Sequence, residues 1–207
     1  MREEMISAPR LDNITSVEAC LQGICHVGRE TGISGILLFD NEEIGSRTRQ
    51  GADSILLSEV LEKLYVSLGV PSGAARTAMR NGFALSLDVA HGFHPNKPEK
   101  ADPTNENPLG KGVVIKRSGA QNYVTDSRAI ASLIMLMDHA GIPYQKFASR
   151  SDATQGGTLG AIASKYVPMR IVDMGVPVLA MHSSRELMAA ADQMALEQAV
   201  RKFFSEE

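Results

Sequence analysis

The chain has 207 residues, which is enough for one sizeable domain with a hydrophobic core of its own. Hydrophobic residues make up 43% and charged residues 22%, a globular composition that excludes a disordered or fibrous protein. The net charge of −3, without a clustered basic stripe, argues against a nucleic-acid partner. No apolar run reaches the roughly 18–20 residues that a membrane span needs, so we expect no membrane partner either.

The two cysteines and the first residues of the chain indicate the cellular compartment in which the protein is expected. Cys20 and Cys25 are five residues apart in a helical pattern, so their side chains point roughly 140° apart, a poor geometry for a disulfide. The opening residues 1–4 lead into mixed polar sequence, and no signal peptide is visible. We therefore expect a reducing, cytoplasmic location.

The first half of the chain alternates amphipathic and apolar segments. Residues 13–30 place apolar side chains at spacings of three and four, which predicts a helix with one buried face. Residues 35–40 form a compact apolar run that predicts a fully buried strand. A second helix is predicted over 53–68, and a second strand over 83–87, ending at Asp88.

The second half begins with a long loop, residues 90–112, which holds four of the nine prolines. The elements predicted after it are strands at 113–116, 144–148, 169–173 and 176–180, and helices at 126–139, 156–166 and 184–204. Strands that alternate with helices predict one α/β domain in three layers, a mostly parallel sheet with helices on both faces. Ligands of such sheets bind outside the carboxyl ends of the strands.

Acidic residues and a histidine fall at the predicted strand ends. Glu42 and Glu43 follow the strand at 35–40, Asp88 closes the next strand, and His182 follows the strand at 176–180. Asp12 precedes the first helix. Carboxylates about 4 Å apart repel by roughly 4 kcal/mol at an effective dielectric of about 20, so a cluster of them calls for protons or a cation.

These residue types have a metal-binding interpretation and an ordinary one. Carboxylates with an imidazole form a ligand set suited to zinc, manganese or cobalt. An aspartate at a strand end is also a common turn or cap residue, a Glu-Glu pair is commonly solvated, and a single histidine is commonly a hydrogen-bonded structural residue. The spacing alone leaves both interpretations open.

Four segments, in order, carry a family resemblance. Residues 7–13, 39–46, 86–96 and 181–186 resemble the RLDN, DNEEIGS, DxAHxxHPN and MHSxRE motifs of the aspartyl aminopeptidase family of zinc metallopeptidases. The resemblance runs nearly from end to end. It implies a zinc-dependent aminopeptidase that removes N-terminal residues, Asp or Glu among them, from peptide substrates.

The resemblance also implies a two-metal site occupied by Zn²⁺, with Mn²⁺ or Co²⁺ as alternatives. Asp12 would bridge both ions, Glu43 and His182 would complete the protein ligands of one ion, and Asp88 would bind the other. Glu42 would be the general base that takes a proton from the attacking water.

The resemblance assigns substrate contacts to further residues. Lys116 and Tyr123 lie where the family contacts its substrate, and a lysine ammonium would favour an acidic N-terminal side chain; the alternative is an ordinary lysine at a strand end. Gly156 belongs to the segment 152–160, which is similar to a family loop that lines the site. His94 would contact substrate or serve a structural role.

Members of this family are about twice as long as this chain. We therefore expect residues 1–207 to be the C-terminal part of the catalytic domain, without the N-terminal half that holds a further histidine ligand and an inserted β-rich domain. The unequal ligand sets then predict that one metal ion binds more tightly than a second. We expect a homo-oligomer or association with a separate N-terminal half. The alternative is a catalytically inactive subunit that binds metal and assembles with a partner chain.

Overall fold

The computed structural model describes residues 4–28, 30–124, 126–150, 152 and 156–206. Its strands are β1 (Met5–Ala8), β2 (Phe83–Leu87), β3 (Ala90–His91), β4 (Val113–Arg117), β5 (Tyr144–Ala148), β6 (Arg170–Gly175), β7 (Pro177–Val178) and β8 (Glu186–Ala189). Its α-helices are α1 (Leu11–Cys25), α2 (Leu56–Ser67), α3 (Ser72–Asn81), α4 (Ser127–Ala140), α5 (Leu159–Ala163) and α6 (Ala190–Ser205). Two short 3₁₀ turns, η1 (Glu42–Ile44) and η2 (Pro98–Lys100), complete the described elements. None of the described helices is both long and apolar enough to cross a bilayer.

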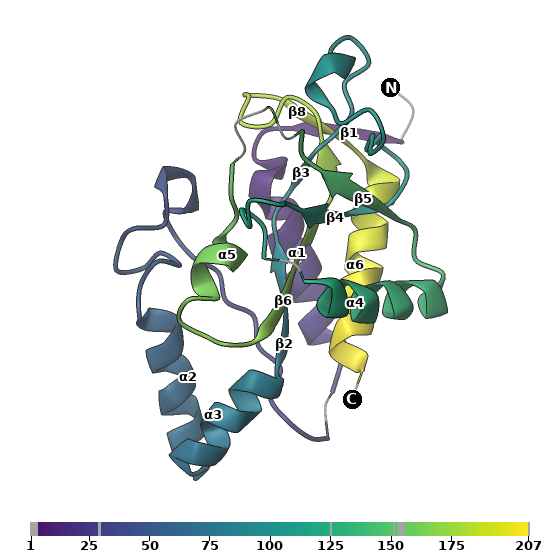
Figure 1. Ribbon diagram of the computed structural model, residues 1–207. Helices are drawn as coiled ribbons and strands as arrows, with labels where there is room; N and C mark the ends of the chain where they lie inside the picture. Colours follow the sequence, from purple (N-terminus) through teal and green to yellow (C-terminus); the bar gives the residue numbers. More distant parts are fainter. Residues whose placement is uncertain (1–3, 29, 125, 151, 153–155, 207) are drawn as a thin grey trace.

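A four-stranded sheet in the order β2-β6-β4-β5 forms the centre of the fold (Figure 1). β2 runs parallel to β6 and β4 runs parallel to β5, whereas β4 and β6 are antiparallel. Two small pairs, β3 with β7 in parallel and β1 with β8 in antiparallel, extend the structure beyond the carboxyl end of β2. The predicted α/β class is confirmed. The sheet is mixed, because its two central strands, β6 and β4, are antiparallel.

The alternation of side chains along β2 and β6 explains why helices cover both faces. Leu87 and Met174 belong to the main core together with residues of α1, α4 and α6. Ser86 and Asp173, paired in register, point to the opposite face, where α5 packs. A Cβ at Gly160 of α5 would lie 2.6 Å from Ser86 Oγ, so glycine is what allows this close approach.

The strand predicted at residues 35–40 is wrong. The segment has no regular secondary structure and is not part of any described strand pair, and Leu37 and Leu38 are 45% and 60% exposed. An apolar run becomes a buried strand only where neighbouring strands accept its hydrogen bonds and helices cover its side chains. Ile36 packs against the main core and Phe39 against a smaller core that includes Leu57, but no strand within the described residues pairs with this segment.

Several other boundaries differ from the sequence prediction. The helix predicted at 13–30 ends at Cys25, and the helix predicted at 156–166 is reduced to α5. Of the segment 152–160, residues 153–155 lie outside the described part of the chain. The segment 184–204 divides into β8 and α6 because Glu186–Ala189 pairs with β1. The prediction omitted α3, whose polar sequence buries only Ala75.

The close crossing at Gly175 gives a stability prediction. A Cβ there would lie 1.8 Å from the backbone oxygen of Asp88, so Gly175→Ala must push these two backbones apart. We expect a loss of about 1–3 kcal/mol or more in the free energy of unfolding, measured by urea titration. Gly73→Ala in α3, where a Cβ meets nothing within 4 Å, is the control and should be neutral or slightly stabilising. Equal midpoints for the two variants would contradict this packing.

Candidate metal centre

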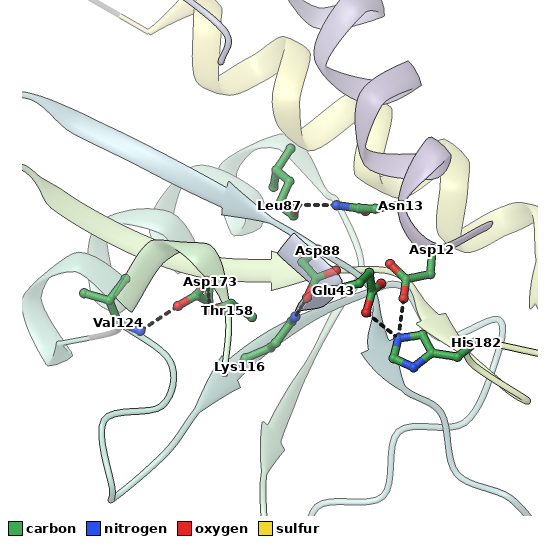
Figure 2. Close-up of polar contacts among 10 residues, drawn as sticks. All are labelled: Asp12, Asn13, Glu43, Leu87, Asp88, Lys116, Val124, Thr158, Asp173 and His182. Carbon is green, nitrogen blue, oxygen red and sulfur yellow. Dashed lines mark hydrogen bonds and ion pairs between the residues drawn. The ribbon is translucent and has the colours of Figure 1, made fainter. Parts of the chain in front are cut away.

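Three side chains from distant parts of the chain meet beyond the carboxyl end of β2. Asp12 lies at the start of α1, Glu43 in η1, and His182 in the turn between β7 and β8. His182 Nε2 lies 3.0 Å from Asp12 Oδ2 and 3.2 Å from Glu43 Oε2 (Figure 2). The three ligand atoms all lie within 4.8 Å of one another. The structure thus brings together three of the four predicted metal ligands as a compact group.

The spacing of these atoms fits a zinc ion. Donors about 2.0–2.2 Å from a tetrahedral Zn²⁺ lie about 3.3 Å apart, close to the two separations around the imidazole. Two carboxylates and one imidazole leave a fourth position open, as catalytic zinc sites do. The side chain of Asp12 is 5% exposed, while those of Glu43 and His182 are 58% and 61% exposed, so the group is open to solvent on one side.

Asp88 and Glu42 lie beside this group. Asp88 Oδ2 is 3.2 Å from the ammonium of Lys116 and stands outside the three-donor group (Figure 2). Glu42 precedes Glu43 in η1, and the charges of Asp88 and Glu43 both act on it. All five residues named by the family motifs therefore belong to one electrostatic cluster.

Two carboxyl groups in this cluster hold protons more tightly than usual. Burial, then repulsion from Asp88 and Glu43, raises the pKa of Asp12 to about 7, although nearby His182 opposes the shift. Burial and the same two acids raise the pKa of Glu42 to about 7, opposed by Lys116 and His182. The metal-free cluster thus carries more negative charge than its surroundings stabilise, the condition under which a bound cation is favoured.

Glu186 organises the group and was assigned no role from the sequence. Its carboxylate accepts the backbone N–H of His182 through Oε1 at 2.7 Å and that of Asp12 through Oε2 at 2.9 Å. The side chain is almost fully buried, and the residue is 2% exposed. His182 also has a φ of 67°, an uncommon conformation that this contact helps to hold. Its place in the MHSxRE segment is the available clue, but the sequence pattern places Glu186 inside the helix predicted at 184–204.

The predicted substrate residues lie in two neighbourhoods. Lys116 on β4 is 2% exposed, and its ammonium sits 5.4 Å from the ring centroid of the buried Tyr123. Gly156 is exposed, and two residues further on the N–H of Thr158 donates to the carbonyl of Asn122, which joins this segment to the Tyr123 loop. His94 is exposed in the loop after β3, where its Nδ1 accepts the N–H of Asn96.

Asp173 is a second buried acid that the sequence interpretation passed over. Its carboxylate accepts the Val124 N–H and the Thr158 hydroxyl, both at 2.6 Å (Figure 2). Desolvation raises its pKa, and Lys116 together with these hydrogen bonds opposes that shift. Asp173 therefore fixes the two loops that carry Tyr123 and Gly156 to the central sheet.

Comparison with known proteins identifies the family. Residues 1–204 match the model of the aminopeptidase I zinc metalloproteases, M18. The chain belongs to the M18 family. It is 42% identical over 205 residues to a probable M18 family aminopeptidase 2 of Clostridium acetobutylicum, with 99% of this chain and 47% of that protein covered. The chain thus spans about half the length of the curated M18 relatives it matches.

Solved M18 structures share the fold. The S. cerevisiae mApe1 dodecamer superposes with a TM-score of 0.84 at 30% identity, covering 97% of this chain and 46% of that one. An aminopeptidase of the M18 family from Thermotoga maritima superposes with a TM-score of 0.89, covering 99% and 47%. At 22% identity, this second likeness shows the fold alone.

Replacing Glu186 tests its positioning role. A glutamine has one amide oxygen, so in Glu186→Gln the N–H of either Asp12 or His182 loses its acceptor. We expect a loss of about 10–100-fold in Zn²⁺ affinity, the usual effect of removing a contact that orients metal ligands, measured by equilibrium dialysis. Glu62→Gln on the exposed side of α2 is the control. Unchanged zinc affinity in a folded Glu186→Gln chain would refute the role.

The raised pKa values predict a pH dependence of the metal-free chain. Unfolded Asp and Glu titrate near 4, whereas Asp12 and Glu42 titrate at about 7 in the folded chain. The folded state therefore binds more protons between these values, and the free energy of unfolding should fall as the pH rises through this window. Urea titrations with a chelator present should show a shallower fall for Asp12→Asn. An identical slope in both chains would contradict the shift at Asp12.

Proposed function

We propose that this chain forms the C-terminal part of the catalytic domain of a zinc-dependent aminopeptidase, which removes N-terminal residues from peptides. The observation that carries the proposal is the convergence of Asp12, Glu43 and His182 at separations suited to one Zn²⁺. Membership in the M18 family supports the same chemistry. Asp12 and Asp88 would hold a second ion, and Mn²⁺ or Co²⁺ are alternative occupants.

Glu42 is the proposed general base. When bound, the metal ions act as Lewis acids on the scissile carbonyl and lower the pKa of water. Glu42 then accepts the proton of the attacking water and returns it to the leaving amine. Its raised pKa of about 7 in the metal-free cluster matches a group that exchanges protons near neutrality.

Lys116 supports a preference for acidic N-terminal residues. Its ammonium is buried beside Asp88, at the edge of the proposed metal site and above the Tyr123 ring. A buried cation there would pair with an Asp or Glu side chain of a bound peptide. Gly156 and His94 would contribute contacts from the surrounding loops.

The uncovered apolar segments support assembly with further protein. Large exposed apolar side chains gather between residues 33 and 68: Ile33, Leu37, Leu38, Ile44, Ile55, Leu56, Val60, Val66 and Leu68. Exposed apolar surface of this kind is typical of an interface. We propose a homo-oligomer, as in the yeast dodecamer, or association with a separate N-terminal half. These segments also favour the second candidate, a metal-binding subunit that is inactive without its partner chain.

The test is release of the N-terminal residue from short peptides by the zinc-loaded chain. Glu42→Gln should lower kcat by about 10²–10⁴-fold, the usual contribution of a general base, and leave the bound zinc unchanged. Acetylating the peptide N-terminus should abolish cleavage if the site recognises a free amine. Peptides that begin with Asp and Ala measure the acidic preference.

Each outcome separates the candidates. Activity that survives Glu42→Gln would remove the proposed base. Zinc binding without any peptide cleavage would favour the inactive subunit. Cleavage of acetylated peptides would point to a metallohydrolase of another kind.

A further inference from the structure

Lys116 is the cation that faces Asp88 in this structure. Its side chain is 3% exposed, and Nζ lies 3.2 Å from Asp88 Oδ2. The main-core residue Ile115 precedes it on β4, so Lys116 points to the opposite face of the sheet, the face of Asp173. The ring of Tyr123 lies 5.4 Å from the same ammonium. The Lys116 ammonium is thus held between the Asp88 carboxylate and the Tyr123 ring.

The two halves of the carboxylate cluster differ in their partners. Asp12 and Glu43 both contact His182, whose imidazole is itself a proposed metal ligand. Asp88 instead contacts a lysine, which is a cation with no lone pair to offer a metal while it is protonated. A metal ion bound to Asp88 must come within about 2.0–2.2 Å of its oxygen. The ammonium already occupies one side of that oxygen.

We infer that Lys116 is a built-in counter-cation for Asp88 that competes with a second metal ion, so the first ion binds at Asp12, Glu43 and His182 and the second must displace the Lys116–Asp88 pair. The inference rests on the proposed function for the first site. The number of protein ligands already predicts that the two metal ions bind with unequal affinity. In this inference, the side chain of Lys116 contributes to that difference.

The competition has a consequence for substrate recognition. A second ion at Asp88 releases the Lys116 ammonium from its ion pair with that carboxylate. The freed charge then lies beside the metal site, close enough to act on Asp173 and Glu42, and can also pair with an acidic side chain of the substrate. Loading of the second ion and binding of an acidic residue are therefore linked, each favouring the other.

The experiment counts Zn²⁺ per chain by equilibrium dialysis at fixed pH and ionic strength. Lys116→Gln and Lys116→Met remove the charge and keep a side chain of similar length. Both should strengthen binding of the second ion by about tenfold or more, which is about 1.4 kcal/mol, and leave the first ion unchanged. Lys116→Arg keeps the charge and should behave as the parent chain. Lys146→Gln, an exposed lysine on the neighbouring strand β5, is the matched control.

Asp88→Asn separates the two sites. This variant should lose the second ion and keep the first, and combining it with Lys116→Gln should remove the gain. If both neutral Lys116 variants fail to fold, the parent chain still tests the inference, because the ¹⁵N resonance of the Lys116 ammonium should shift on addition of the second zinc equivalent. The inference would be overturned if loss of the Lys116 charge left the affinity for the second ion unchanged. It would also be overturned if the Lys116 resonance did not shift when the second zinc equivalent was added. If the parent chain bound no zinc ion at Asp12, Glu43 and His182, that result would instead count against the proposed function.

Discussion

Repulsion among carboxylates at one edge of the sheet is the constraint on which the site depends. Asp12, Glu42, Glu43 and Asp88 lie in one cluster, and each pair about 4 Å apart costs roughly 4 kcal/mol at an effective dielectric of about 20. Burial and this repulsion together raise the pKa of Asp12 and of Glu42, and one buried lysine lies against Asp88. Neither protonation nor the lysine removes all of the repulsion, and a divalent cation bound among the remaining acids would neutralise the rest.

Close backbone contacts hold these acidic residues near one another at the edge of the sheet. Gly175 lets the chain after β2 cross the end of β6 in direct contact, and this crossing fixes Asp88. Glu186 joins Asp12 and His182, which are 170 residues apart in sequence, through two backbone N–H groups. Since a buried carboxylate needs strong donors, Glu186 is itself stabilised by the segments it positions. The hydrogen bonds that position Asp12 and His182 therefore also stabilise the buried charge of Glu186.

The sequence predicted most of what depends on local pattern. The strand at 83–87 was placed correctly because an apolar run ends at Asp88, and the strand at 144–148 because it follows the break at Pro143. The family motifs named residues that the structure brings into one cluster. Glu186 and Asp173 escaped because their role lies in tertiary hydrogen bonds, which no spacing reveals. The strand at 35–40 was wrong because apolar composition reports that a segment can be buried, not whether anything covers it.

Local hydrogen bonds fix the turn that carries Glu42 and Glu43, although Leu37 and Leu38 in the segment before it are exposed. The N–H of Ser46 donates to the Asn41 carbonyl, and the Asn41 side chain donates to the Thr48 hydroxyl. Ser46 is fully buried, and a Cβ at Gly51 would lie 2.3 Å from its carbonyl oxygen. Contacts within about ten residues therefore fix this turn without help from a neighbouring strand. This local closure explains how Glu43 reaches His182 although Leu37 and Leu38 are exposed and no described strand pairs with the segment before the turn.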